Sequence, residues 1–118
     1  MTAQGRGMKI VIDLPIISGN KLLRMHWTKR AKIRDDYYMA IIEQIEYPMM
    51  AKEIKAKVII LSRRSRLLDK DNLYAGAKPL VDALKKSGLI WDDSPRWINL
   101  KVRQVIDAGN PRTEIEIT

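Results

Sequence analysis

The chain has 118 residues, and its 22 Lys and Arg against 14 Asp and Glu give a formal net charge of +8. A chain of this length buries enough apolar surface to fold as one domain without a disulfide or a structural metal. Cysteine is absent and His26 is the single histidine, which excludes thiol catalysis, iron–sulfur clusters and zinc sites built from cysteine or several histidines. The cationic excess favours a polyanionic partner such as nucleic acid, although many basic domains bind none.

No apolar segment approaches the roughly 20 residues that a membrane span requires. Residues 1–7 also lack the apolar stretch that is typical of a secretion signal. We therefore expect a soluble, cytoplasmic protein without a membrane partner. Residues 1–7 are expected to form a flexible N-terminal arm or to be a remnant of cloning, which leaves 8–118 as the folded domain.

The first half of the chain predicts a strand, a helix and a second strand. Alternating apolar residues over 9–14 predict the first strand, and the turn chemistry of 18–21 follows it. Apolar residues at helical spacing predict a helix over 28–47, with Thr28 as its N-cap. Residues 54–61 become continuously apolar toward their end, which predicts a second strand that is buried on both faces there.

A second helix is predicted over 72–86, where apolar residues again follow helical spacing and Gly88 is a natural terminator. Pro79 lies inside this segment, and proline in a helix interior removes one hydrogen bond and clashes with the preceding turn. We therefore expect a kink or a broken turn between Ala75 and Pro79.

The end of the chain predicts two strands, 97–107 and 113–117, joined as a hairpin by the turn 108–111. The element order is then β-α-β-α-β-β. It predicts an α+β fold of one domain, in which a small mixed four-stranded sheet carries two helices packed on it.

Carboxylates gather in two groups around the second predicted helix. Asp69 and Asp71 precede it two positions apart, so they point to the same side of an extended segment, and Asp92 and Asp93 follow it. Asp82 shares a helical stripe with Asp71. Mg²⁺ and Mn²⁺ prefer oxygen ligands and are often held by a few carboxylates together with phosphate oxygens. The groups predict a site for such a metal, and the alternative is that they only cap the helix and form a turn.

Three segments in this order resemble the RusA-like Holliday junction resolvases of bacteria, prophages and phages: 68–73 (LDKDNL), 78–84 (KPLVDAL) and 88–94 (GLIWDDS). The resemblance implies a homodimeric, magnesium-dependent endodeoxyribonuclease without an organic cofactor. Such an enzyme resolves four-way DNA junctions by paired symmetric nicks in DNA recombination and repair. The endonuclease domain would be 8–118, acting at the bacterial nucleoid and encoded by the bacterium, a phage or a prophage.

The resemblance also implies roles for single residues. It carries the family's metal-binding acids onto Asp69, Asp71 and Asp93, which would hold Mg²⁺ or Mn²⁺, and its essential lysine onto Lys78. These four residues are expected to be catalytic, with Lys78 stabilising charge on the scissile phosphate. The chain departs from the enterobacterial pattern by an insertion just before that lysine. The residues expected to support the ligands and the lysine are Asp92, Asp82 and Asn72.

Two basic segments are candidates for contacts with DNA phosphates, which position a protein on DNA more than they select sequence. The first contains Arg63, Arg64 and Arg66, and the second contains Asn20, Lys21, Arg24, His26, Lys29 and Arg30. For each member of the second segment, a solvated helix start is an equal alternative. A general-base role for His26 is less favoured, because nuclease metals usually activate water themselves. For Trp91 and Trp97, packing in the core or at a dimer surface is favoured over base stacking.

Two other functions remain open from the sequence. One is a non-catalytic nucleic-acid-binding protein of the same fold, which predicts salt-sensitive binding without metal-dependent strand scission. The other is a small structural or interaction module of phage origin, which predicts no preference for branched over linear DNA. A synthetic four-way junction, with and without Mg²⁺, distinguishes these functions from the nuclease.

Overall fold

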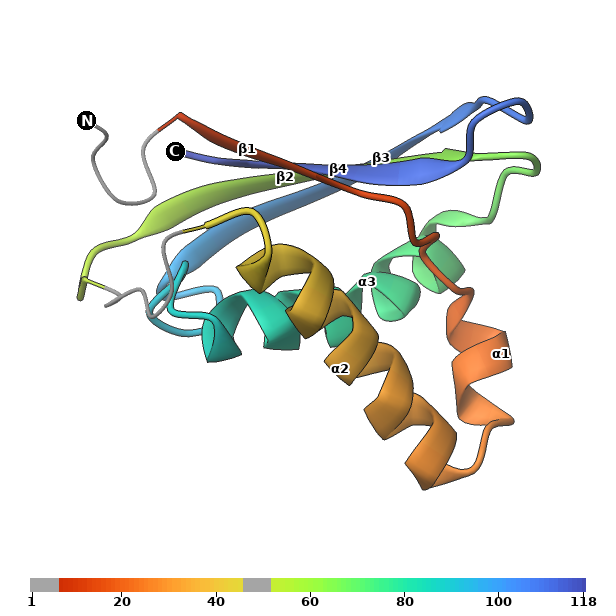
Figure 1. The fold of residues 1–118 in the computed structure, drawn as a ribbon, viewed down its shortest axis with the longest axis horizontal. Coiled ribbons are helices and arrows are strands. Elements are labelled where there is room, and N and C mark those ends of the chain that lie inside the picture. Colours follow the sequence, from red (N-terminus) through yellow and green to blue (C-terminus); the bar gives the residue numbers. More distant parts are fainter. Residues whose placement is uncertain (1–6, 46–51) are drawn as a thin grey trace.

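The structure, a computed structural model, describes residues 7–45 and 52–118, and Figure 1 shows its one sheet with the helices on a single side. The elements follow in the order β1 (Met8–Ile12), α1 (Gly19–Leu23), α2 (Trp27–Ile42), β2 (Ala56–Arg64), α3 (Lys70–Lys86), β3 (Ile98–Ile106) and β4 (Arg112–Ile117). The predicted α+β fold is confirmed. Residues 1–6 of the predicted arm and the end of the helix predicted over 28–47 lie outside the described residues. Within the described ranges, no helix has the length and apolar character needed to cross a membrane.

The sheet has the strand order β1-β4-β2-β3, in which β4 is antiparallel to both neighbours and β2 is parallel to β3. The hairpin predicted for the last two strands is therefore wrong, because β2 lies between β3 and β4. The reason is the burial of β4, whose Thr113, Ile115 and Ile117 are all buried, whereas β3 exposes Lys101 and Arg103. A strand with a fully buried face gains most from a central position, and exposed charged side chains suit an edge.

The helical layer begins with α1, a third helix where the sequence predicted only two. Its single turn falls on predicted turn chemistry and is capped by the Ser18 Oγ, which accepts from the Lys21 N–H (3.2 Å). α2 then begins earlier than predicted, because His26 rather than Thr28 is its N-cap. The His26 Nδ1 accepts from the Thr28 backbone N–H (3.3 Å) and lies 2.8 Å from the Thr28 Oγ1. His26 therefore has a structural role at the start of α2.

α3 runs unbroken from Lys70 to Lys86 although Pro79 lies inside it, so the predicted broken turn is absent. Gly76 instead allows a close approach of the chain before α1. A Cβ at this position would lie only 1.9 Å from the carbonyl oxygen of Ile17. The helix ends as predicted before Gly88, whose φ of 85° is typical of a residue that follows a helix.

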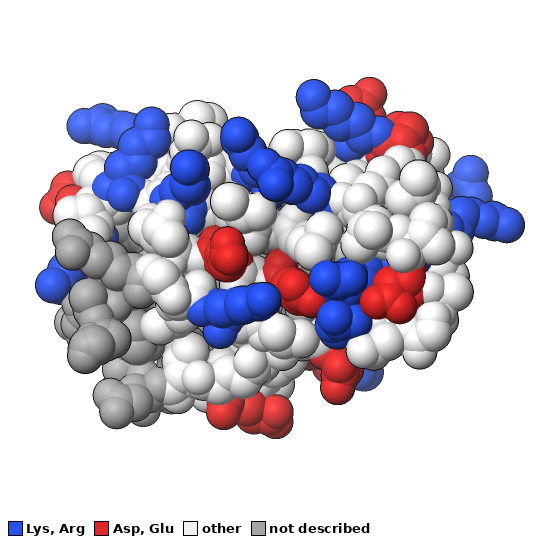
Figure 2. Space-filling view, turned by 90° about the horizontal axis from the view of Figure 1, so that it is seen from above, with Lys and Arg blue, Asp and Glu red and all other residues white. Residues whose placement is uncertain are grey.

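The core lies between the helices and the sheet face that they cover. α3 contributes Ala77, Leu80 and Leu84, all fully buried. The sheet contributes alternate residues of its strands, Ile10, Ile12, Val58, Ile60, Ile115 and Ile117. No element of the described chain covers the opposite face, which Figure 2 shows with Lys and Arg side chains around a few acidic ones.

Side chains occupy backbone hydrogen-bonding groups on both edge strands. On β1, the Gln44 Oε1 accepts from the Val11 N–H (3.1 Å), and the Gln44 Nε2 donates to the Val11 carbonyl (2.6 Å). On β3, the Tyr74 hydroxyl accepts from the Val102 N–H (3.1 Å). The Gln104 side chain adds a two-point contact (2.9 and 2.6 Å) to the backbone of the loop before α3. That loop is thereby fixed against β3.

Glu114 of β4 connects strands on the uncovered face of the sheet. Its carboxylate lies 2.7 Å from the Arg63 Nε, 3.0 Å from the Arg112 Nη2 and 3.6 Å from the Lys9 Nζ. The hydrogen bond from Arg63 is the main reason that the pKa of Glu114 lies below its usual value.

The lowered pKa of Glu114 predicts a loss of stability in acid. Because the folded state holds this carboxyl ionised more strongly than the unfolded state does, its contribution is complete above the ordinary glutamate pKa of about 4.3. The contribution is lost as the pH falls through the lower pKa of the folded state. In thermal melts from pH 7 to pH 3, the Glu114→Gln variant should therefore melt below the wild type at pH 7 and approach it at pH 3. Parallel curves for the two proteins would contradict this assignment.

Candidate functional site

The first predicted acid, Asp69, is the N-cap of α3. Its Oδ2 accepts from the Asn72 backbone N–H (3.3 Å) and its Oδ1 accepts from the Asn72 Nδ2 (2.5 Å). The bond from the Asn72 side chain is the largest of the interactions that lower the pKa of Asp69. The Asn72 Oδ1 also accepts from the Asn20 N–H (2.8 Å), which connects α1 to the start of α3. Asp69 and Asn72 therefore fix the junction of the two helices.

Asp71 lies in the first turn of α3 and is exposed. Asp82 follows eleven residues later, so the two are separated by about 16 Å along the helix axis. Nowhere in residues 7–45 and 52–118 do three His, Cys, Asp or Glu side chains lie close enough to hold a metal ion together. The structure therefore does not bring Asp69, Asp71 and Asp93 into one cluster within this chain.

Asp93 instead meets Asp82. Desolvation raises the pKa of Asp82 most, and a hydrogen bond with the Asp93 carboxyl and repulsion by its charge raise the pKa further. The charges of Lys78 and Arg34 act in the opposite direction. The charge of Asp93 disfavours ionisation of Asp82, so a proton or a metal cation bound at Asp82 is stabilised. We call Asp82 and Asp93 the acid pair.

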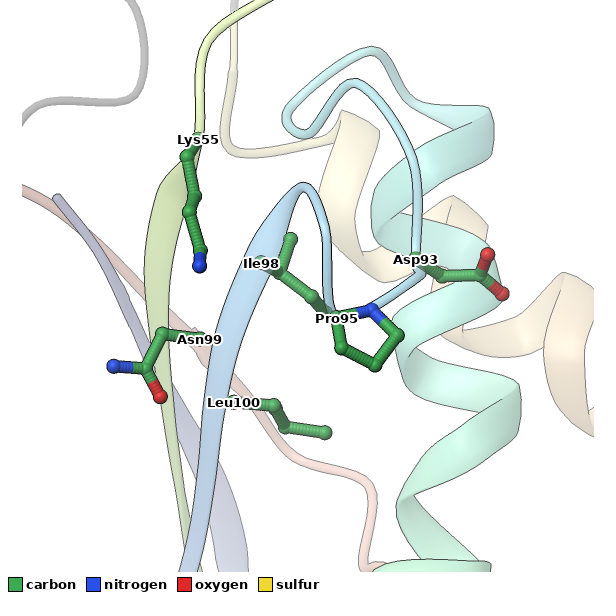
Figure 3. Close-up of a pocket in the computed structure, with 6 residues that line it drawn as sticks. All are labelled: Lys55, Asp93, Pro95, Ile98, Asn99 and Leu100. Carbon is green, nitrogen blue, oxygen red and sulfur yellow. The ribbon is translucent and has the colours of Figure 1, made fainter.

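Figure 3 shows the other side of Asp93, a hollow of about 370 Å³ lined by Lys55, Asp93, Pro95, Ile98, Asn99 and Leu100. The Asp93 carboxylate points away from the Lys55 ammonium group and the Asn99 amide. The polar groups of this hollow therefore do not converge on one point. The Asp93 carboxylate is therefore part of the acid pair and is not aimed at the other polar groups of this hollow.

A second hollow, of about 400 Å³, lies between α2 and α3 and reaches the acid pair. It is lined by Trp27, Arg30, Ala31, Arg34, Lys78, Pro79 and Asp82. We call it the α2–α3 groove. Three of its side chains are cationic, so it has the charge to hold phosphate next to the acid pair. Lys78, Arg30 and Asp82 are predicted site residues, and all three line this groove.

Two groove residues, Trp27 and Arg34, were not predicted from the sequence. A signal for them was present, because Trp27, Arg30 and Arg34 are three, four and seven positions apart and share one face of α2. The apolar periodicity of α2 predicts only its buried face. Of the exposed stripe on the same helix, only Arg30 was predicted to contact DNA.

Asp92 lies outside the acid pair. Its Oδ1 is 2.8 Å from the Lys85 Nζ, and the hydrogen bond from Lys85 is the main reason that the pKa of Asp92 is lowered. This ion pair attaches the segment after α3 to the last turns of the helix. It leaves Asp93, the next residue, beside Asp82.

The arginines before α3 are in different surroundings. Arg63 and Arg64 belong to β2, so the strand runs further than predicted. Arg63 bonds to Glu114, and Arg64 donates to the carbonyls of Ile16 (2.8 Å) and Arg66 (2.7 Å). Arg66 is exposed. Arg63 and Arg64 therefore use hydrogen-bond donors within the protein, and Arg66 is the best placed of the three for a DNA phosphate.

The second basic segment lies on α1, on the start of α2 and between them. All its predicted members are exposed, namely Asn20, Lys21, Arg24, His26, Lys29 and Arg30. The segment adjoins the α2–α3 groove, because Arg30 is common to both. The groove therefore continues into a larger cationic surface.

In comparisons with known proteins, no family model and no curated protein matches the chain. The relation to the Holliday junction resolvases therefore stays a prediction from the motif residues.

Proposed function

We propose that the protein is a metal-dependent endodeoxyribonuclease that acts on branched DNA, in the manner of the RusA-like Holliday junction resolvases. The observation that carries the proposal is the acid pair beside Lys78, whose Asp82 lines a groove that also holds Arg30 and Arg34. Carboxylates for a cation and fixed cations for a phosphate are the two requirements of metal-dependent phosphodiester hydrolysis. The DNA would be cytoplasmic, from a bacterium or its phage.

The acid pair fits a hard metal ion better than the three predicted acids do. Mg²⁺ and Mn²⁺ need only one or two carboxylates when phosphate oxygens and water complete the coordination. The charge of Asp93 disfavours ionisation of Asp82, and a divalent cation would remove this cost. When bound, the metal would polarise the phosphate and lower the pKa of a coordinated water.

The other residues of the groove would position the DNA. Arg30 and Arg34 can each donate two parallel hydrogen bonds to a phosphate, and Lys78 adds a positive charge one helical turn before Asp82. Because these cations come from two packed helices, they would hold one backbone segment rigidly against the acid pair. Asp69 and Asn72 would contribute indirectly, by fixing α1 against α3.

We further propose a two-fold symmetric homodimer. Two active sites related by symmetry can address two like strands of one junction, which a single site cannot do at once. Nicks at symmetric positions are the expected product.

The proposed function is tested with a synthetic four-way junction and a linear duplex of the same sequence, each incubated with Mg²⁺, with Mn²⁺ or with a chelator. We expect nicks in the junction only when a divalent cation is present. No scission of either DNA with either metal would overturn the nuclease proposal.

A non-catalytic nucleic-acid-binding protein is the second candidate. It is favoured by the absence of a three-carboxylate cluster in the described ranges, together with a groove that keeps its cations. It predicts binding without scission, and each phosphate contacted changes the slope of log affinity against log salt by about 0.9. The three groove cations alone would give a slope of about −3.

A further inference from the structure

The elbow between α1 and α2 presents the two most exposed large apolar side chains in the described part of the chain. Leu23 is 78% exposed and Trp27 is 65% exposed. Figure 1 shows that the two helices meet at the end of the molecule farthest from the sheet. An exposed aromatic ring such as that of Trp27 has a large apolar face available to a ligand. We call Leu23 and Trp27 the apolar elbow.

The charge around the apolar elbow indicates the kind of partner. The segment 14–34 contains no Asp or Glu, and it contains Lys21, Arg24, Lys29, Arg30, Lys32 and Arg34. The apolar elbow is therefore surrounded by cationic side chains. Such a surface complements a ligand that carries both apolar faces and negative charges. Unpaired nucleotides have this character, because every base has a flat aromatic face and every linkage has a phosphate.

The position of Trp27 links the elbow to the proposed active site. Trp27 lines the same groove as Arg30, Arg34 and Lys78. From Trp27 to Arg34, α2 rises by about 10 Å, so the groove is long enough to hold the phosphates next to a base at Trp27. A strand whose base lies on the Trp27 ring would therefore pass its next phosphates along the groove toward the acid pair. The His26 ring, with its centroid 5.7 Å from that of Trp27, borders the platform on one side.

We propose that Trp27 is a stacking platform for an unpaired nucleobase. The surface would thus recognise DNA in which bases are unpaired, at a branch point or in a single strand, in preference to a continuous duplex. This inference rests on the proposed function only in taking DNA as the negatively charged ligand. It concerns the binding of DNA and not its scission.

The test measures binding in a chelator, so that no cleavage occurs. Fluorescently labelled single strand, four-way junction with unpaired bases at its centre, and paired duplex are titrated with wild type, Trp27→Ala, Trp27→Phe and Trp91→Ala. Trp91 is the matched control, because it is an exposed tryptophan in the segment after α3. We expect Trp27→Ala to weaken binding of the single strand and the junction by about tenfold or more. Duplex binding should change by less than about twofold, and Trp27→Phe and Trp91→Ala should bind as the wild type does.

Two results would overturn the inference. One is an equal effect of Trp27→Ala on single strand and duplex, or no effect on either. The other is stronger binding of the wild type to phosphatidylglycerol vesicles than to single strands, with that binding lost in Trp27→Ala, which would assign the elbow to a membrane surface. A protein that shows the expected binding pattern and never cuts DNA would overturn only the nuclease proposal. A nuclease whose Trp27→Ala variant binds single strands normally would overturn only the stacking platform.

Discussion

Substitution of Asp93 by Asn is expected to reduce metal-dependent scission of a four-way junction by about 10³-fold or more. A bound metal contributes several kcal/mol of transition-state stabilisation, and each 1.4 kcal/mol corresponds to a tenfold change in rate. Asn keeps the size of the side chain but removes the negative charge that holds the cation. Rates of nicking with Mg²⁺ and Mn²⁺ measure the loss. Binding of the junction in a chelator should be unchanged or tighter, because repulsion of the phosphate is reduced.

Asp82→Asn and Asp71→Asn distinguish the two candidate ligand sets. If the acid pair holds the metal, Asp82→Asn loses activity as Asp93→Asn does, and Asp71→Asn retains it. If the three acids implied by the resemblance hold the metal, Asp71→Asn is inactive and Asp82→Asn is active. Normal nicking by Asp93→Asn would contradict both.

Thermal stability provides a check on the acid pair that does not depend on activity. The pKa of Asp82 is raised in the folded state, so its ionisation disfavours folding as the pH rises through that pKa. At neutral pH, Asp82→Asn should therefore be as stable as the wild type or more stable. Mg²⁺ should raise the melting temperature of the wild type by mass action and should leave that of Asp82→Asn unchanged. An equal effect of Mg²⁺ on both proteins would place the cation elsewhere.

Substitution of Gly76 by Ala is expected to destabilise the fold by more than about 2 kcal/mol. In an exposed helix interior the same change usually stabilises by about 1 kcal/mol, because glycine has the greater backbone entropy to lose. Here the new Cβ would lie 1.9 Å from the Ile17 carbonyl oxygen and 2.9 Å from its carbon. These are backbone atoms, so relief requires the segment before α1 to move away from α3. Denaturant unfolding at equilibrium measures the change.

Gly109→Ala is the matched control for Gly76→Ala. No heavy atom outside the neighbouring residues lies within 4 Å of a Cβ built at Gly109. We expect its free energy of unfolding to differ from the wild type by less than about 0.5 kcal/mol. A Gly76→Ala protein as stable as Gly109→Ala would show that the contact with Ile17 is not close in solution.

The sequence predicted elements better than it predicted their partners. Local periodicity identified the helix that became α3 and the strand that became β2, because their burial follows the chain itself. The central place of β4 depends on long-range pairing with β1 and β2, in which Ile115 lies opposite Ile10 and Ile60. No local pattern contains that information. α1 was missed because one helical turn has the same sequence chemistry as a turn.

In the candidate site, too, local spacing was predictable from the sequence and long-range neighbours were not. Helical spacing placed Lys78 and Asp82 on one side of α3, and both line the groove. Which carboxylate lies beside Asp93 depends instead on the length of α3. α3 has 17 residues and rises by about 25 Å, while the seven residues that follow Lys86, up to Asp93, reach at most about 25 Å when fully extended. Because Gly88 begins a tight turn, Asp93 returns only as far as Asp82 and not to Asp71.

The occupied edges of the sheet have a consequence for the behaviour of the protein at high concentration. Sheets grow into fibrils when an exposed edge strand accepts a strand from another molecule. On β1 such growth would have to displace both Gln44 contacts with Val11, and on β3 it would have to displace Tyr74 from Val102. The native protein should therefore resist amyloid-like polymerisation, although its strands are rich in isoleucine and valine. Strand exchange between subunits at either edge would have to displace the same contacts.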